Sequence, residues 1–420
     1  MTSLPYIYPN VKRVSLPYSV TQVSPPFDVT QLSLQFVDGV PFISEALCAW
    51  GKLTEISCGG LDATALVHLG GQTTLRKLSF SLPNSKACLD SLPFRAFASV
   101  RDFEIHAVTL PCLIAFITRV GGSPASMRME VDTNPSPSAV SSLFTALGQF
   151  QLRDLSLRLV NQSPLVMAVQ NAPPILPFPF LNLHTPHPIL LHHPNHHPTP
   201  AVHLVPPTHG SHIFLNQVAA SQPTLPSTTF HVLTARDFAP LTFFENLGRI
   251  NINVDHAICL DDGDIKSLVS SWPHLHSFSL NDVTGWRVKS NITHFGLIAM
   301  LELCPHLQTL CIALNTDALK EVPQDRLGQG IENTLLQKLG LADSAIETHK
   351  TVIVAAFLSD IFPNLTGILA WDSVEMMQRS NKATVYGERW TQVCEMVKAI
   401  NNVRKQERRW QQENGDEGES

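Results

Sequence analysis

Apolar residues recur along this chain in the pattern L-x-x-L-x-L, in which other apolar residues can fill each slot. The pattern begins at Val11, Val29, Leu53, Leu75, Val100, Leu152, Leu247, Leu275, Leu307, Leu336 and Leu365. The last four steps are 28, 32, 29 and 29 residues, and the steps from Val29 to Val100 are 24, 22 and 25. Such a period is typical of leucine-rich repeats, in which a short strand points its apolar residues inward and a helix covers the other side of the core.

The segments between these motifs have helical features. "DATALVHLGGQ" predicts a short helix with Asp62 near its start and a Gly pair near its end. "HFGLIAMLELCPHL" has apolar residues at helical spacing, and Pro305 ends the predicted helix. The pattern therefore predicts an α/β fold: an irregular leucine-rich-repeat solenoid, a horseshoe of short parallel strands backed by helices, with repeats over 1–158 and 236–372.

The stretch "LCPHLQTLCI" places Cys304, His306 and Cys311 close together, as a metal or redox site would. Related copies, "WPHLHSFSL", "FPNLTGILA" and "YPNVKRVSL", fill both cysteine slots with other residues. We therefore interpret the stretch as repeat architecture. Cys311 lies between two inward positions, so we expect it on the opposite, concave face as an exposed thiol.

A segment over 159–235 interrupts the repeats. It contains no Asp, Glu, Lys or Arg, and it holds 14 of the 31 prolines and 10 of the 18 histidines. Imidazoles at this density bind transition metals weakly, but proline-rich chain offers no fixed cage, so we predict no metal site. We favour a disordered insertion; a degraded pair of repeats and a shifted reading frame are the alternatives.

The C-terminal part predicts an amphipathic helix within 373–410, followed by an acidic, disordered tail over 411–420. Its apolar stripe consists of Trp390, Val393, Cys394, Val397, Ile400 and Val403. We interpret the helix as a cap over the last repeat. The alternative is a partner-binding helix with the basic residues Arg404, Lys405, Arg408 and Arg409.

Composition excludes several classes of protein. The net charge of −6 gives no basic field that would attract nucleic acid. The sequence contains no apolar run of 18 residues, the length that a membrane-spanning helix needs. The start of the sequence has no signal-peptide pattern, so we expect an intracellular protein, cytoplasmic or nuclear. No motif of a nucleophile, nucleotide or zinc site occurs; "GGSPAS" is interpreted as a turn and "DDGD" as a helix start. We expect no enzyme and no cofactor.

Four segments, "DDGDIKSLVSSWPHLHSFSL", "ITHFGLIAMLELCPHLQTLCIALNTDAL", "VAAFLSDIFPNLTGILAWD" and "RWTQVCEMVKAINNVRKQERRW", resemble the leucine-rich-repeat region of fungal F-box-like proteins. The resemblance covers Leu241 to Trp410 and, with fewer matches, Leu53 to Leu159. It implies the substrate-recognition part of a ubiquitin ligase receptor. The family's F-box precedes the repeats, whereas the first motif here begins at Val11. Binding of the Skp adaptor and cullin is therefore expected only if an F-box exists upstream.

The expected function is non-catalytic protein binding on the concave face. The alternatives are an orphan or truncated interaction protein with no ubiquitin role and, as a minor one, a His-rich weak metal binder. The flanking positions of the strands predict the binding surface. These candidates are Lys77, Glu104, His106, Asp154, Arg158, Arg249, Asn251, Asn253, Ser279, Asn281 and Cys311.

Overall fold

The computed structural model describes residues 13–16, 31–34, 44, 47–48, 52–133, 135–159, 232–319 and 326–415. Residues 160–231, almost all of the predicted insertion and its histidine-rich tract, lie outside the described residues. The chain on both sides of this segment forms one compact unit. The two predicted sets of repeats therefore belong to the same body.

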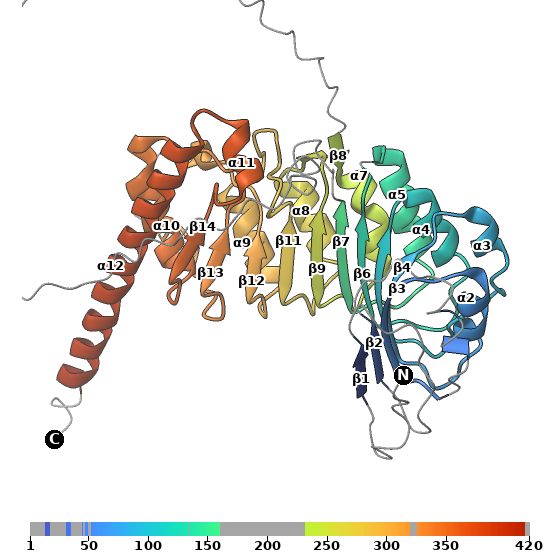
Figure 1. Ribbon diagram of the computed structural model, residues 1–420. Helices are drawn as coiled ribbons and strands as arrows, with labels where there is room; N and C mark the ends of the chain where they lie inside the picture. Colours follow the sequence, from blue (N-terminus) through green and yellow to red (C-terminus); the bar gives the residue numbers. More distant parts are fainter. Residues whose placement is uncertain are drawn as a thin grey trace, which may run out of the picture. The chain divides into compact units, whose positions relative to one another are not determined.

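Among the described residues, parallel strands form one large sheet (Figure 1). Its twelve strands follow the chain order and pair each with the next. They are β1 Arg13–Leu16, β2 Gln31–Leu34, β3 Glu55–Gly60, β4 Lys77–Leu82, β5 Asp102–Ala107, β6 Ser126–Val131, β7 Asp154–Leu159, β9 Arg249–Asn253, β11 Ser277–Leu280, β12 Thr309–Cys311, β13 Lys338–Gly340 and β14 Gly367–Leu369. A separate pair consists of β8 Val232–Thr234 and β10 Ala257–Cys259. β7 and β9 lie on either side of the 160–231 segment in the sequence, yet they pair directly with each other, so the sheet is not interrupted there.

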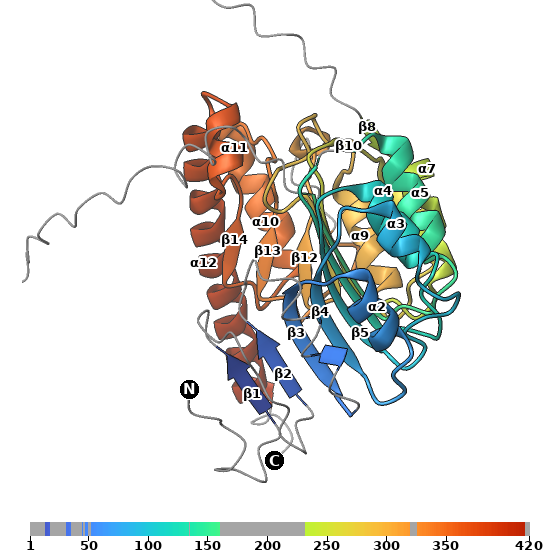
Figure 2. The same cartoon turned by 45° about the vertical axis from the view of Figure 1, so that its right-hand side comes forward.

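Helices connect the strands and cover one face of the sheet, as Figure 2 shows for α2, α4, α5 and α9. The helices are α2 Ala63–Gly70, α3 Lys86–Asp90, α4 Leu110–Ile117, α5 Pro137–Leu147, α7 Ala235–Phe238, α8 Asp262–Val269, α9 His294–Leu303, α10 Thr351–Ile361, α11 Val374–Arg379 and α12 Ala383–Gly415. Short 3-10 turns are η2 Ala239–Phe243, η3 Thr316–Ala318 and η4 Thr348–Lys350. The fold is thus α/β, with a parallel sheet backed by helices.

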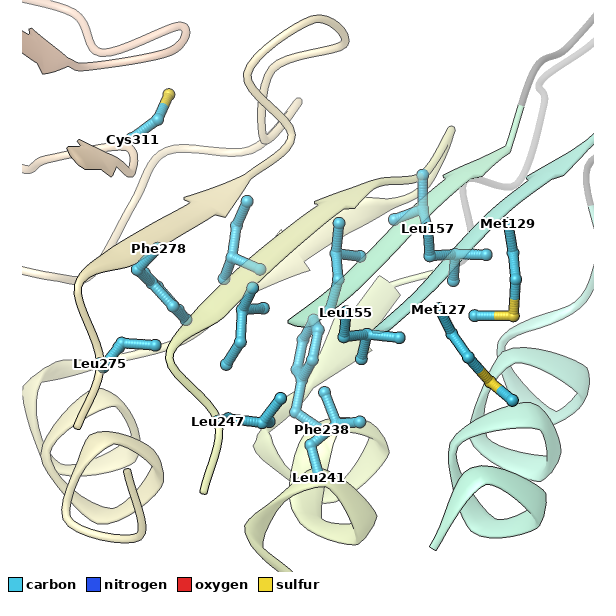
Figure 3. Close-up of a cluster of buried hydrophobic side chains, with 14 of the residues drawn as sticks. Met127, Met129, Leu155, Leu157, Phe238, Leu241, Leu247, Leu275, Phe278 and Cys311 are labelled. Carbon is cyan, nitrogen blue, oxygen red and sulfur yellow. The ribbon is translucent and has the colours of Figure 1, made fainter. Parts of the chain in front are cut away.

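The alternation of apolar residues explains which face is covered. In β4 the buried residues are Leu78, Phe80 and Leu82, and in β7 they are Leu155, Leu157 and Leu159. Leu155 and Leu157 point toward the helical side of the sheet, where Phe238 and Leu241 also lie (Figure 3). Apolar burial of about 1.5–3 kcal/mol for each large side chain is the main force holding the helices to the sheet.

Helix starts and ends follow the predicted signals. Asp62 accepts a hydrogen bond from the backbone N–H of Ala65 (2.8 Å) at the start of α2, and α9 ends at Leu303, before Pro305. In "DDGD", Asp261 accepts from the N–H of Asp264 (2.8 Å), and Asp264 accepts in turn from that of Asp261 (3.2 Å). This capping box confirms that the acidic run begins a helix.

The "GGSPAS" segment is a turn that leads into β6. Gly122 has a φ of +76°, and a Cβ there would lie 2.3 Å from the carbonyl oxygen of Ala98. Only glycine fits this position without moving the neighbouring backbone. The strand that follows, Ser126–Val131, has no counterpart among the predicted motifs.

The C-terminal part contains two helices. α12 packs against α10 and the edge strand β14, and it lies beyond β14 in Figures 1 and 2. Trp390, Val393, Cys394 and Val397 of the predicted stripe are buried. Val403 is 52% exposed, because the contacting face of α12 at this level carries the buried Asn401 and Arg404, which pairs with Asp360. The helix also continues to Gly415, so the predicted boundary at residue 410 is wrong; 416–420 lie outside the described residues.

Two further features, membrane-spanning helices and groups of metal-binding side chains, are absent from the described residues. No helix among them is both long and apolar enough to cross a bilayer. Nor do they bring three or more His, Cys, Asp or Glu side chains into a group that could hold a metal ion.

Candidate binding face of the sheet

The side chains of the main sheet that point away from the helices form a surface that we call the open face. Strand register arranges its residues in rows that run across the strands. One row includes Ser79, Glu104, Arg128, Ser156 and Asn251, and it continues through Ser279, Cys311 and Gly340. These side chains come from strands far apart in the sequence, yet they are neighbours in space.

From β4 to β9 the open face carries charges of alternating sign, a part that we call the charged ladder. Glu104 lies 3.5 Å from Arg128, and Asp154 lies 4.0 Å from Arg249. In the next row, Glu130 stands between His106 and Arg158 in register. Solvent-exposed pairs of this kind contribute at most about 1 kcal/mol each, so stability does not depend on the ladder. Its charges remain available to a partner.

Seven of the eleven candidate binding residues are exposed or half-buried on the open face: Lys77, Glu104, His106, Asp154, Arg158, Arg249 and Asn251. Arg128 and Glu130 belong with them but were absent from the candidates, because the strand that carries them was not predicted. Alternation of Met127, Met129 and Val131 with polar residues is the sequence signal for that strand.

The remaining four candidates, Asn253, Ser279, Asn281 and Cys311, are buried. Asn281 is 0% exposed: it accepts from the N–H of Val254 (2.8 Å) and donates to the carbonyls of His256 and Gly285 (3.0 Å each). Asn253 accepts from the N–H of Val283 (3.0 Å). These two amides hold the loops after β9 and β11, and they are not free to contact a target.

The loop after β11 is also fixed by a carboxylate from the loop after β13. Asp343 accepts hydrogen bonds from the backbone N–H groups of Trp286 (2.7 Å) and Arg287 (2.8 Å). The Arg287 guanidinium forms an ion pair with Asp255, and both side chains are about nine-tenths buried. These contacts join the loops that follow β9, β11 and β13 at one end of the sheet.

Beside the charged ladder lies a groove of about 890 Å³ over β11, β12 and β13. Its floor consists of small side chains, Ser277, Ser279, Thr309 and Cys311 among them. Asp282 and Val283 line it from the loop after β11, and Asp372 and Ser373 line it from the loop after β14. The Ser373 hydroxyl donates to the Val283 carbonyl, so the two loops meet at this end of the groove. The volume is within the range of ligand-binding pockets.

Cys311 points away from the core, as predicted (Figure 3), but the expectation of an exposed thiol is wrong. It is only 8% exposed, because its side chain lies over Gly340 of β13, where a Cβ would be 2.6 Å from the Sγ atom. Burial, helped by the nearby Asp282 and Asp372 carboxylates, raises the pKa of the Cys311 thiol to about 12.

Thiol labelling tests this environment. Burial also raises the pKa of Cys58 to about 12 and that of Cys304 to about 11. Because the thiolate is the reactive form, we expect these two and Cys311 to resist a maleimide at pH 7.5 in the folded protein and to react on denaturation. The partly exposed Cys88 and Cys112 serve as internal controls. Mass spectrometry of the labelled peptides measures the relative labelling rate of each cysteine. Rapid labelling of Cys311 in the native protein would contradict this prediction.

No family model matches this chain, and no curated protein is significantly similar to it. The function must therefore be argued from the geometry of the open face.

Proposed function

We propose that this protein is a non-catalytic protein-binding scaffold of leucine-rich-repeat type, which holds a target on the open face. The observation that carries the proposal is the two-faced sheet: helices bury one face, while the other presents ordered rows of charged and polar side chains beside a groove. Strands in chain order, separated by covering helices, agree with a repeat architecture.

The resemblance to fungal F-box-like proteins supports a more specific role, recognition of a substrate for ubiquitin ligation. In that family the adaptor-binding segment precedes the repeats. For the chain described here the proposal is therefore confined to target binding, and the ubiquitin role depends on an F-box upstream.

Site-specific crosslinking tests the proposal. A photoreactive residue placed at Lys77 or Arg158, both on the charged ladder and exposed, is expected to capture the same protein from cells of the source organism. The matched control is Glu302, which is exposed on α9 on the helical side. Capture from Glu302 but not from the ladder would overturn the proposal.

Charge reversal then tests the captured partner in purified form. Arg128→Glu combined with Arg158→Glu is expected to weaken its affinity at least about tenfold, equivalent to 1.4 kcal/mol, because two complementary charges become repulsive. The control is Lys398→Glu on α12. An unchanged dissociation constant for the double variant would contradict a role for the ladder.

A further inference from the structure

The groove over β11–β13 is nearly neutral along its floor and acidic at one end. Asp282 and Asp372 both lie in its lining, at the end where the two loops meet. In the part of the chain that the structure describes, neither carboxylate has a Lys, Arg or His within ion-pair distance. Lys338 also lines the groove and stands at the start of β13, two residues before Gly340.

The Asp282 carboxylate is incompletely satisfied. Its Oδ1 atom is buried, and it accepts no hydrogen bond from the described residues. A buried acceptor without a donor costs free energy, more so when it is charged. The fold does not offset this cost with its own groups. The Oδ1 atom itself is closed to an incoming group, but Asp282 is only half-buried and lines the groove, so a donor can approach the side chain from there.

We propose that the acidic end of the groove receives a lysine or arginine side chain from a peptide segment of the bound target. The inference rests on the proposed function and names the chemistry of the partner. Hydrogen bonds from an ammonium or guanidinium group to a carboxylate are about twice as strong as neutral ones, which offsets the desolvation of the incoming cation.

The floor of the groove suits the stem of such a side chain. Long basic residues pack their methylene groups on apolar surface while the charged end stays with polar partners. Cys311 and Gly340 leave the floor flat and small, and Leu369, 49% exposed on β14, borders it. Lys338 repels a second basic residue at the other end, so the groove selects a single basic side chain with neutral or acidic neighbours.

The probe for this inference is a set of short synthetic peptides with arginine, lysine, alanine or glutamate at a fixed central position and mixed residues elsewhere. The full chain is expected to bind the arginine and lysine sets at least tenfold more tightly than the glutamate set in fluorescence anisotropy. Asp282→Asn with Asp372→Asn is expected to remove that preference. The matched control, Glu302→Gln with Glu388→Gln, neutralises two exposed carboxylates outside the groove and leaves the preference intact.

The stability of the Asp282→Asn variant provides a second readout. It distinguishes a carboxylate that binds a ligand from a carboxylate that stabilises the fold. Removing a buried, unpaired charge is expected to leave the urea midpoint of Asp282→Asn unchanged or higher; a clear fall would assign Asp282 a structural role and overturn the inference. Equal binding of basic and acidic peptides, binding of none, or a preference that survives the double substitution would also overturn it. Crosslinking from the charged ladder would still support the proposed function in those cases, so the two failures are distinguishable.

Discussion

Replacement of Asp343 by alanine is expected to lower the free energy of unfolding by about 3 kcal/mol. The carboxylate accepts hydrogen bonds from two backbone N–H groups, those of Trp286 and Arg287, and bonds to a charged group contribute about 1.5–3 kcal/mol each without full additivity. Gly285, with a φ of +70°, lets the loop approach so closely that a Cβ would lie 2.7 Å from Asp343. Urea unfolding followed by circular dichroism measures the change.

The matched control is Asp317→Ala. Asp317 lies in the short 3-10 turn η3 and forms an ion pair with Lys289 at 2.6 Å, but both side chains are more than half exposed. Exposed pairs contribute about 0–1 kcal/mol, so this variant is expected to unfold within that range of the unaltered protein. Equal losses for Asp343→Ala and Asp317→Ala would show that the two backbone hydrogen bonds do not hold the loop.

The strand pattern of this chain was readable from the sequence because each strand buries one face. Leu78 and Phe80, or Leu155 and Leu157, repeat with period two, and the helix between strands repeats with its own period. The strand Ser126–Val131 does not fit the motif because the first slot, three residues before Met127, is Pro124 rather than an aliphatic residue. The step from Val100 to Leu152 is about two repeat lengths, which leaves room for this strand.

The candidate site was only partly readable, because period two predicts which face of the sheet a side chain points to and not whether neighbouring residues or loops cover it. β9 ends at Asn253 and β11 at Leu280, and the chain then turns over the strand ends. Asn281, with a φ of +53°, no longer follows the alternation that suggested exposure. The polar side chains at these positions satisfy loop backbone groups instead of facing a partner.

The groove depends on long-range contacts that no local pattern reveals. Ser373 and Val283 meet although 90 residues separate them, and their two loops bring Asp282 and Asp372 to the same end of the groove. Charge on the open face is therefore divided between two neighbouring parts: a ladder whose charges pair with one another, and a groove whose carboxylates do not. Under the proposed function, the paired charges of the ladder would orient a partner, and the unpaired carboxylates of the groove would favour a basic side chain.

The second large effect is expected at the C-terminal end of the sheet, where Trp390→Ala should lower the free energy of unfolding by about 3–5 kcal/mol. Trp390 is 1% exposed, and its indole N–H donates to the carbonyl of Ser344 at 2.9 Å. It belongs to the face of α12 that packs on α10 and β14. Without the indole, a cavity opens beneath the helix that covers the edge strand.

Trp410→Ala is the control, because this residue lies on the same helix and is 61% exposed. We expect it to change stability by less than about 0.5 kcal/mol, as surface substitutions usually do. Equal effects of the two substitutions would contradict a capping role for α12.

Hydrogen exchange distinguishes loss of the cap from general destabilisation. Because each unit of a repeat array contacts mainly its neighbours, Trp390→Ala is expected to speed amide exchange first in β13 and β14, with β4 and β5 affected least. A uniform increase across the sheet would show instead that the array unfolds as one cooperative unit. α12 would then stabilise the whole open face, and the binding surface on distant strands would depend on a helix that does not touch it.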